Sequence, residues 1–232
     1  MQLLKITSSL STLLLIIFYI IFSKRNKDKK FWVIFLYCLC SLILDILIHL
    51  SKFQPYKFFL YSFFTLIEYT SFSYFLLLTY KEKSYKWLLI LCTILFYMVM
   101  LYSIVHEPNG EFDNLTSSIA GLLVIIFCIL FFYEQLQDTK TNFIYSSKSF
   151  WIVSGCLIYT STTLFLFVSV GLFKLSNNQE ESVWMLNNFI NIIKNILFGI
   201  AFYKLPPTLV DSLSDKSKDS LTGSAKAFNQ YL

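Results

Sequence analysis

The chain has 232 residues, of which 56% are hydrophobic, 19% are aromatic and only 14% are charged, and its formal net charge is +5. Soluble domains contain about 25% charged residues, so this composition excludes an ordinary soluble fold, which would leave too much apolar surface in water. The basic residues cluster in short segments beside apolar runs, which is typical of membrane topology signals and argues against a nucleic-acid-binding surface.

Seven apolar runs are each close to the ~20 residues that a helix needs to cross a bilayer. The predicted spans are 3–22, 31–50, 58–79, 87–105, 115–133, 149–173 and 184–203. We expect the first run to be a retained anchor and not a cleaved signal peptide, because its basic cluster follows the apolar residues and no cleavage site of small residues is present. No proline lies within any span. We therefore predict an all-α bundle of seven uninterrupted transmembrane helices within residues 1–204.

The distribution of Lys and Arg predicts the orientation of the chain. With the N-terminus outside, the inside segments contain 14 of the 19 Lys and Arg residues and the outside segments contain 4. The outside segment 106–114 has three acidic residues and neither Lys nor Arg. The C-terminus is then cytoplasmic, and residues 205–232 form a polar tail that we expect to be disordered. We expect a multi-pass protein of a bacterial inner membrane, in contact with the lipid bilayer.

The last span carries a polar stripe. Asn187, Asn191, Lys194 and Asn195 follow the i, i+4, i+7, i+8 spacing of one helix face. Lys194 lies near the middle of the span, where a charge costs several kcal/mol unless it is paired or hydrated, so it is a candidate functional residue. Lipid offers no hydrogen-bond partners, and we therefore expect this stripe to face the interior of the bundle.

Acidic residues lie at comparable depths in two other spans. A helix rises 1.5 Å per residue, which places Glu68 and Lys194 each ~15 Å from the outer end of its span, near the midplane of a ~30 Å core. Asp45 and His49 lie nearer the outer surface. The functional interpretation is a Glu68–Lys194 pair in a polar cavity that binds a ligand or relays protons. The structural interpretation is a buried ion pair that fixes helix register, with the asparagines as hydrogen-bonding groups between helices.

No catalytic residue and no metal site are predicted. Asp45, His49 and Glu68 match a zinc site weakly, and the seven-helix zinc hydrolases of the ceramidase and adiponectin-receptor type need several intramembrane histidines, whereas this chain has 2 His in total. All five cysteines lie in apolar runs and are expected to be free, buried thiols. The hydroxyl row 159–163 has no base placed to activate it and is expected to bond its own backbone or a neighbouring helix. The loops are too short for a catalytic domain, so we do not expect an enzyme.

Two resemblances to known families follow from these motifs. The lysine in the middle of span 7 and the carboxylate in the middle of span 3 resemble the Schiff-base lysine and counterion of microbial rhodopsins, which implies retinal on Lys194 and Glu68 as its counterion. The chain departs from that family at Ile190, where those proteins have an aspartate. The runs FWIVSGCLIYTSTTLFLF and NIIKNILFGIAF resemble a group of uncharacterised seven-helix bacterial inner-membrane proteins without soluble domains.

These observations favour a sensor or signal-coupling module. It would bind a small lipophilic ligand, or a membrane partner, in the polar interior and pass the change to a cytoplasmic or membrane signalling protein. The alternative is a proton-coupled small-solute transporter or channel that uses Glu68 and Lys194, although no broken helix or internal repeat points to one. A third interpretation is a retinal-binding protein. Apart from that third interpretation, the sequence predicts no cofactor, and it predicts no nucleic-acid partner.

Overall fold

The computed structural model describes residues 2–22, 28–49, 57–106, 114–137, 144–172 and 177–203. These residues form seven α-helices and a short 3-10 helix, η3 (Ile144–Ser146). The α-helices are α1 (Gln2–Ile21), α2 (Lys29–His49), α3 (Lys57–Thr79), α4 (Lys83–His106), α5 (Asn114–Gln137), α6 (Lys148–Leu172) and α7 (Asn177–Tyr203). Each α-helix contains most of one predicted span. The predicted tail at 205–232 lies outside the described residues.

Two helices begin well before the apolar run that predicts them. α4 begins at Lys83 and not near 87, and α7 begins at Asn177 and not near 184. The apolar run marks only the part of a helix that lipid requires, whereas backbone hydrogen bonding continues through polar turns at the membrane surface. Hydrophobicity therefore predicts the existence of these helices better than it predicts their ends.

Five helices in the described part of the chain are long and apolar enough to cross a membrane, namely α2, α4, α5, α6 and α7. The apolar part of α1 is shorter and covers Ile6–Ile21. α3 is not among the five, because hydroxyl side chains and Glu68 dilute its apolar residues. The chain is therefore an all-helical, multi-pass membrane protein.

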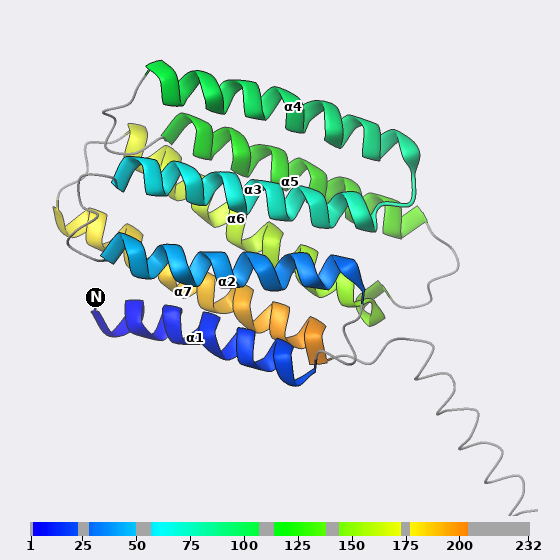
Figure 1. Cartoon of the computed structure of the whole chain (residues 1–232), viewed down its shortest axis with the longest axis horizontal. Helices are drawn as coiled ribbons and strands as arrows, with labels where there is room; N and C mark the ends of the chain where they lie inside the picture. The colour runs from blue at the N-terminus through cyan, green and yellow to red at the C-terminus, as the bar shows by residue number, and fades with distance from the viewer. Residues whose placement is uncertain are drawn as a thin grey trace, which may run out of the picture.

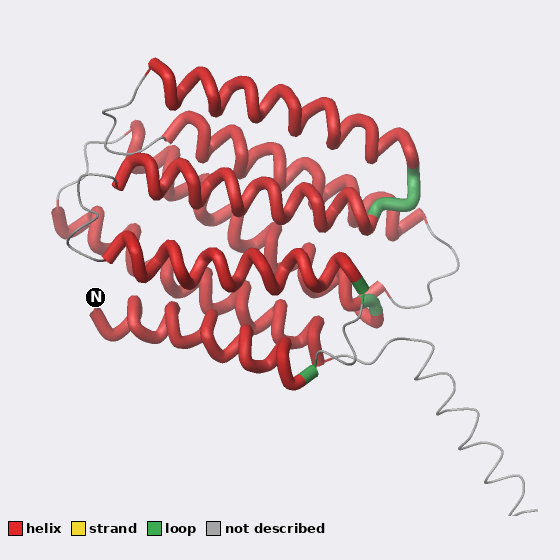
Figure 2. The backbone as a smooth tube through the Cα atoms, in the orientation of Figure 1, coloured by secondary structure: helices red, strands yellow, loops and turns green. Residues whose placement is uncertain are grey.

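Six of the helices form a closed ring (Figure 1). α1 contacts α2, α2 contacts α3, α3 contacts α5, α5 contacts α6, α6 contacts α7, and α7 contacts α1. Successive helices alternate in direction, so α1, α3, α5 and α7 all begin at one end, which we call the N-terminal end of the bundle (Figure 2). α7 ends at the opposite, C-terminal end.

α4 lies outside this ring and contacts α3 and α5 (Figure 1). It meets them along a narrow stripe that includes Leu89, Phe96 and Met100, all of which are buried. Large apolar side chains elsewhere on the helix are exposed, and Trp87 is 72% exposed. A helix that is apolar all round and packs on one side only is suited to contact with lipid.

The half of the bundle near its C-terminal end is packed with aromatic rings. Seven fully buried aromatic side chains come from α2, α3, α5 and α7, and they are Tyr37, Phe72, Phe75, Phe127, Phe131, Phe198 and Phe202. The ring centroids of Tyr37 and Phe72 lie 4.8 Å apart, and those of Phe72 and Phe198 lie 6.5 Å apart with nearly perpendicular planes. Such pairs add roughly 0.5–1.5 kcal/mol each beyond area burial. We call this half the aromatic core.

α6 and α7 approach closely at Gly155. A Cβ atom placed there would lie 2.9 Å from Cε1 of Phe198, whose ring is fully buried and packed against Phe72. At Gly121 a Cβ atom would make an ordinary contact of 3.5 Å with Leu164. The two glycines therefore have different structural roles, although both lie within apolar helices.

We predict that Gly155→Ala lowers the melting temperature of the purified protein in detergent. Overpacking a core costs about 1–3 kcal/mol, which exceeds the gain of about 1 kcal/mol from replacing glycine by alanine in a helix. Gly121→Ala is the matched control and should leave the melting temperature unchanged or raise it. Equal effects of the two substitutions would contradict the close approach at Gly155.

Glu134 connects α5 to the start of α4. Sequence analysis ends the fifth span at 133 and places Glu134 in a loop, but α5 continues to Gln137 and the Glu134 side chain is buried. Its Oε1 atom accepts hydrogen bonds from the backbone N–H groups of Lys81, at 2.9 Å, and Glu82, at 2.6 Å. A carboxylate that accepts N–H groups at the start of a helix satisfies donors that the helix itself leaves unpaired. Glu134 therefore fastens the peripheral α4 to the ring.

We predict that Glu134→Ala destabilises the protein by about 1–3 kcal/mol, because the N–H groups of Lys81 and Glu82 lose the buried carboxylate that accepts their hydrogen bonds. Glu134→Gln keeps an acceptor oxygen at the same place and should retain most of the stability. The exposed neighbour offers a control, Glu82→Gln, which should have no effect. Thermal unfolding in detergent measures all three, and a Glu134→Gln loss as large as that of Glu134→Ala would contradict the proposed cap.

Candidate functional site

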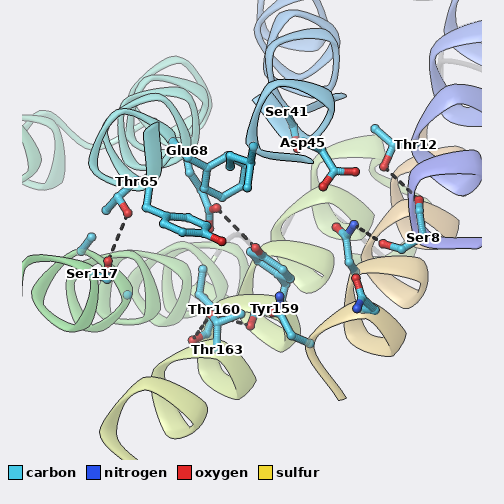
Figure 3. A pocket seen from close by; sticks show the side chains of 18 of the residues that line it. Ser8, Thr12, Ser41, Asp45, Thr65, Glu68, Ser117, Tyr159, Thr160 and Thr163 are labelled. Atoms are coloured by element: carbon cyan, nitrogen blue, oxygen red, sulfur yellow. Dashed lines mark hydrogen bonds between the residues drawn. The ribbon is translucent and has the colours of Figure 1, made fainter. Parts of the chain in front are cut away.

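A cavity of about 430 Å³ lies inside the ring, in the half of the bundle near its N-terminal end (Figure 3). All six ring helices contribute to its lining and α4 does not. Most of its polar lining consists of hydroxyl, amide and carboxylate side chains, including Asp45, Glu68, Asn187 and Asn191. A volume of this size falls in the range of about 300–1,000 Å³ that is typical of small-molecule sites.

Glu68 and Tyr159 mark the inner limit of the cavity. Each lies near the middle of its helix, and the Tyr159 hydroxyl donates a hydrogen bond to Oε2 of Glu68 at 3.4 Å (Figure 3). On the same side of the cavity, a hydrogen bond of 3.1 Å joins the hydroxyls of Thr65 and Ser117. α3, α5 and α6 are thus connected by polar contacts at the depth where lipid surrounds the bundle.

Lys194 lies behind Tyr159 and does not line the cavity. Its side chain is only 2% exposed, and its Nζ atom is 4.1 Å from the centroid of the Tyr159 ring. Nζ also donates a hydrogen bond of 2.8 Å to the hydroxyl of Tyr37 and lies 4.9 Å from that ring. Two aromatic faces and a hydroxyl therefore replace part of the hydration that a buried ammonium loses.

Glu68 and Lys194 interact through space without a direct ion pair. The two charges are near enough to influence each other electrostatically, and Tyr159 contacts both side chains, through its hydroxyl on one side and its ring face on the other. The arrangement of Glu68, Tyr159, Lys194 and Tyr37 is called the buried relay below. The anticipated pair is therefore indirect, with an aromatic ring between its members.

The polar stripe of α7 meets the hydroxyl groups of α1. Asn191 donates a hydrogen bond of 2.8 Å to Ser8, and Asn195 donates to Ser11, at 2.8 Å, and to Thr12, at 3.0 Å. These contacts run along the α1–α7 interface and close the ring. Asn195 therefore connects helices and does not line the cavity, whereas Asn191 does both.

Asp45 approaches the cavity from α2. Its Oδ2 atom accepts a hydrogen bond from Ser9 of α1, and its carboxylate lies among the lining residues (Figure 3). Asn187 also lines the cavity, and its Oδ1 atom is buried without a hydrogen-bond partner. Asn188 donates to the backbone carbonyl of Trp184 on its own helix, at 2.8 Å. His49 is the last residue of α2, and its side chain lies outside the described part of the chain.

The structure thus brings Asp45, Glu68, Asn187 and Asn191 to one cavity. Sequence analysis missed Tyr159 and Tyr37, because tyrosines are common throughout these helices and neither position breaks the apolar pattern. Tyr159 belongs to a hydroxyl row expected to bond its own backbone or a neighbouring helix. Thr160, Thr162 and Thr163 bond their own backbone, and Tyr159 bonds Glu68 of the neighbouring α3. The signal available for Tyr159 was its depth, which matches that of Glu68. Cys38, Cys128 and Cys156 are buried and free.

Comparison with known proteins gives no family assignment, since the chain matches no protein-family model, no curated protein sequence and no solved structure. Both resemblances proposed from the sequence, to microbial rhodopsins and to the group of seven-helix inner-membrane proteins, stay predictions. The functional argument therefore depends on the site alone.

We predict that the buried relay gives a non-additive double-mutant cycle. Lys194→Met removes a buried ammonium that hydrogen-bonds Tyr37 and interacts through space with Glu68, and leaving such buried polar groups without their partner costs roughly 1–3 kcal/mol. Adding Glu68→Gln should recover part of that loss, with a coupling of at least about 1 kcal/mol. Asp45→Asn combined with Lys194→Met is the control and should be close to additive. Unfolding in detergent provides the measurement, and additive losses for Glu68 and Lys194 would contradict their coupling.

Proposed function

We propose that this protein is a seven-span sensor of a bacterial inner membrane, which binds a small ligand in the cavity from the outer side and passes the change to a signalling partner. One observation carries the proposal. A polar cavity is enclosed by six helices in one half of the bundle, and the other half is filled by the aromatic core. A site that is accessible from one side and closed toward the other is suited to detection of a ligand.

The bundle geometry supports seven spans. α1 packs between α2 and α7, and α3 packs against α2, α4 and α5. Their neighbours include four of the five apolar helices, and α1 and α3 run alongside them (Figure 1), so we place α1 and α3 in the same membrane. Their lower hydropathy fits their place in the ring, because much of their polar surface faces the cavity and not lipid.

The charge distribution supports an N-terminus outside and a C-terminus inside. The segments that the sequence assigns to the inside contain 14 of the 19 Lys and Arg residues, and such residues are retained in the cytoplasm. With this orientation the cavity lies in the outer half of the membrane and the aromatic core lies in the cytoplasmic half.

The buried relay connects the cavity to the aromatic core. Glu68 lines the cavity, Tyr159 contacts Glu68 and Lys194, Lys194 bonds Tyr37, and the ring of Tyr37 lies against Phe72. A ligand that changes the position or charge of Glu68 would alter the partners of Lys194. A contiguous chain of packed groups of this kind is a physical route for coupling two ends of a bundle.

Transport is the alternative function, with Glu68 and Lys194 carrying protons or solute. The aromatic core favours sensing over transport, because fully buried rings fill the interior beyond Tyr159. Proton or solute flux into liposomes containing the intact protein, abolished in Glu68→Gln, would establish transport in place of sensing. Retinal attachment to Lys194 stays a prediction, which a visible absorption band after addition of retinal would support.

We predict that a small molecule stays bound when the protein is gently extracted from its native membrane, and that blocking the cavity releases it. Ala120 is buried and lines the cavity, so Ala120→Phe fills part of that space. Leu122, on the same helix, is 51% exposed, and Leu122→Phe is the matched control. Mass spectrometry of the intact complex should find the ligand with the wild type and with Leu122→Phe but not with Ala120→Phe.

The same measurement tests the sensing role. A second polypeptide retained with the wild-type protein would identify the signalling partner. Loss of the small molecule from wild type and control alike would overturn the ligand-binding proposal.

A further inference from the structure

We propose that the cavity binds a small organic ammonium ion, a protonated primary amine, whose charge lies between Asp45 and Glu68. This inference rests on the proposed function, because it names the class of ligand for the same site. Three independent observations carry it: the charge of the lining, the unused hydrogen-bond acceptors, and the mixed polar and apolar character of the walls.

The charges that line the cavity are negative. Asp45 and Glu68 contribute carboxylates, and no Lys, Arg or His occurs among the lining residues whose side chains the structure describes. Lys194 lies nearby but is buried behind the Tyr159 ring. A carboxylate within a membrane favours a nearby cation, so this lining favours a positively charged ligand over an anionic one.

Two of the lining side chains, Glu68 and Asn187, keep unused hydrogen-bond acceptors. Glu68 accepts one long hydrogen bond, of 3.4 Å, although a carboxylate has about four acceptor sites. The Oδ1 atom of Asn187 is buried without a partner. A primary ammonium group carries three N–H donors and no acceptor, so it complements this surplus. An anionic ligand, or a ligand with acceptors only, would bring further acceptors and would leave those of Glu68 and Asn187 unsatisfied.

The apolar part of the lining points to an organic cation and not to a metal ion. Leu42, Ile48 and Phe64 line the cavity together with the aromatic side chains of Tyr61 and Trp184. The volume of about 430 Å³ is far larger than the ~30 Å³ share of one water molecule, so a single inorganic ion would leave most of it empty. A hydrocarbon or aromatic body would fill it, and aromatic faces attract an ammonium group.

The test uses the intact protein in nanodiscs of zwitterionic lipid, with isothermal titration at pH 7. Three probes of similar size differ in charge: 2-phenylethylamine is cationic, 2-phenylethanol is neutral and phenylacetate is anionic. We expect saturable binding of the amine that is at least tenfold tighter than binding of the alcohol, and no binding of phenylacetate. Nanodiscs without protein correct for partition of the probes into lipid.

Substitutions then assign the charge to the two carboxylates. Glu68→Gln and Asp45→Asn should each weaken amine binding at least tenfold and leave alcohol binding unchanged. Asp45→Asn retains the side-chain shape and an acceptor for Ser9. This variant therefore tests whether a carboxylate binds the ammonium group even where Glu68→Gln does not fold. Glu82, which is exposed and outside the cavity, gives the control Glu82→Gln, for which binding should equal that of the wild type.

Three results would overturn the ammonium proposal and leave the proposed sensor in place. Equal affinity for the amine and the alcohol, or tighter binding of phenylacetate, would show a ligand site that does not select cations. Displacement of the amine by an equal concentration of NaCl would show a site for an inorganic ion. Failure of all three probes to bind would also overturn the ammonium proposal, whereas the extraction experiment with Ala120→Phe tests the sensor by itself.

Discussion

The fold depends on the fact that hydrocarbon satisfies no hydrogen bonds. Every polar side chain in the middle of these helices must find its partner inside the protein. The asparagines of α7 find hydroxyl groups on α1, Asp45 of α2 finds Ser9, and Thr65 of α3 finds Ser117 of α5. Polar residues shared among six helices can all face one another only if the helices surround a common interior. A ring with a polar cavity is the arrangement that satisfies them.

The two halves of the bundle meet this requirement differently. In the half near the C-terminal end the interior is filled by aromatic rings, and stability comes from buried area and ring contacts. In the other half polar groups line an open volume. The buried relay lies at the boundary, where Lys194 is held by aromatic faces and Glu68 faces the cavity. Glu68 and Lys194 therefore lie where the polar cavity meets the packed aromatic core.

The helices could be predicted from the sequence because apolar length and the absence of proline are local properties. Their polar stripes could also be assigned to the interior, since lipid leaves no other choice. The arrangement of neighbours could not be predicted. α4 lacks the polar cavity-facing side chains of the ring helices, but that pattern alone does not tell that α3 contacts α5 directly and that α4 lies outside. The place of Tyr159 between Glu68 and Lys194 depends on that arrangement. The indirect interaction of Glu68 with Lys194 could therefore not be predicted from the sequence either.

The contact between α1 and α7 has a consequence for synthesis of the protein. The ring is closed by the first and the last of its helices in chain order, so the most distant segments must meet before the cavity has a complete wall. During translation α1 enters the bilayer before α7 has been synthesised. Ser8, Ser11 and Thr12 then lack the hydrogen bonds that Asn191 and Asn195 later donate to them. The intermediate helices must therefore leave one edge of the assembly open until α7 is inserted, and a nascent chain released before that point exposes a polar seam to lipid.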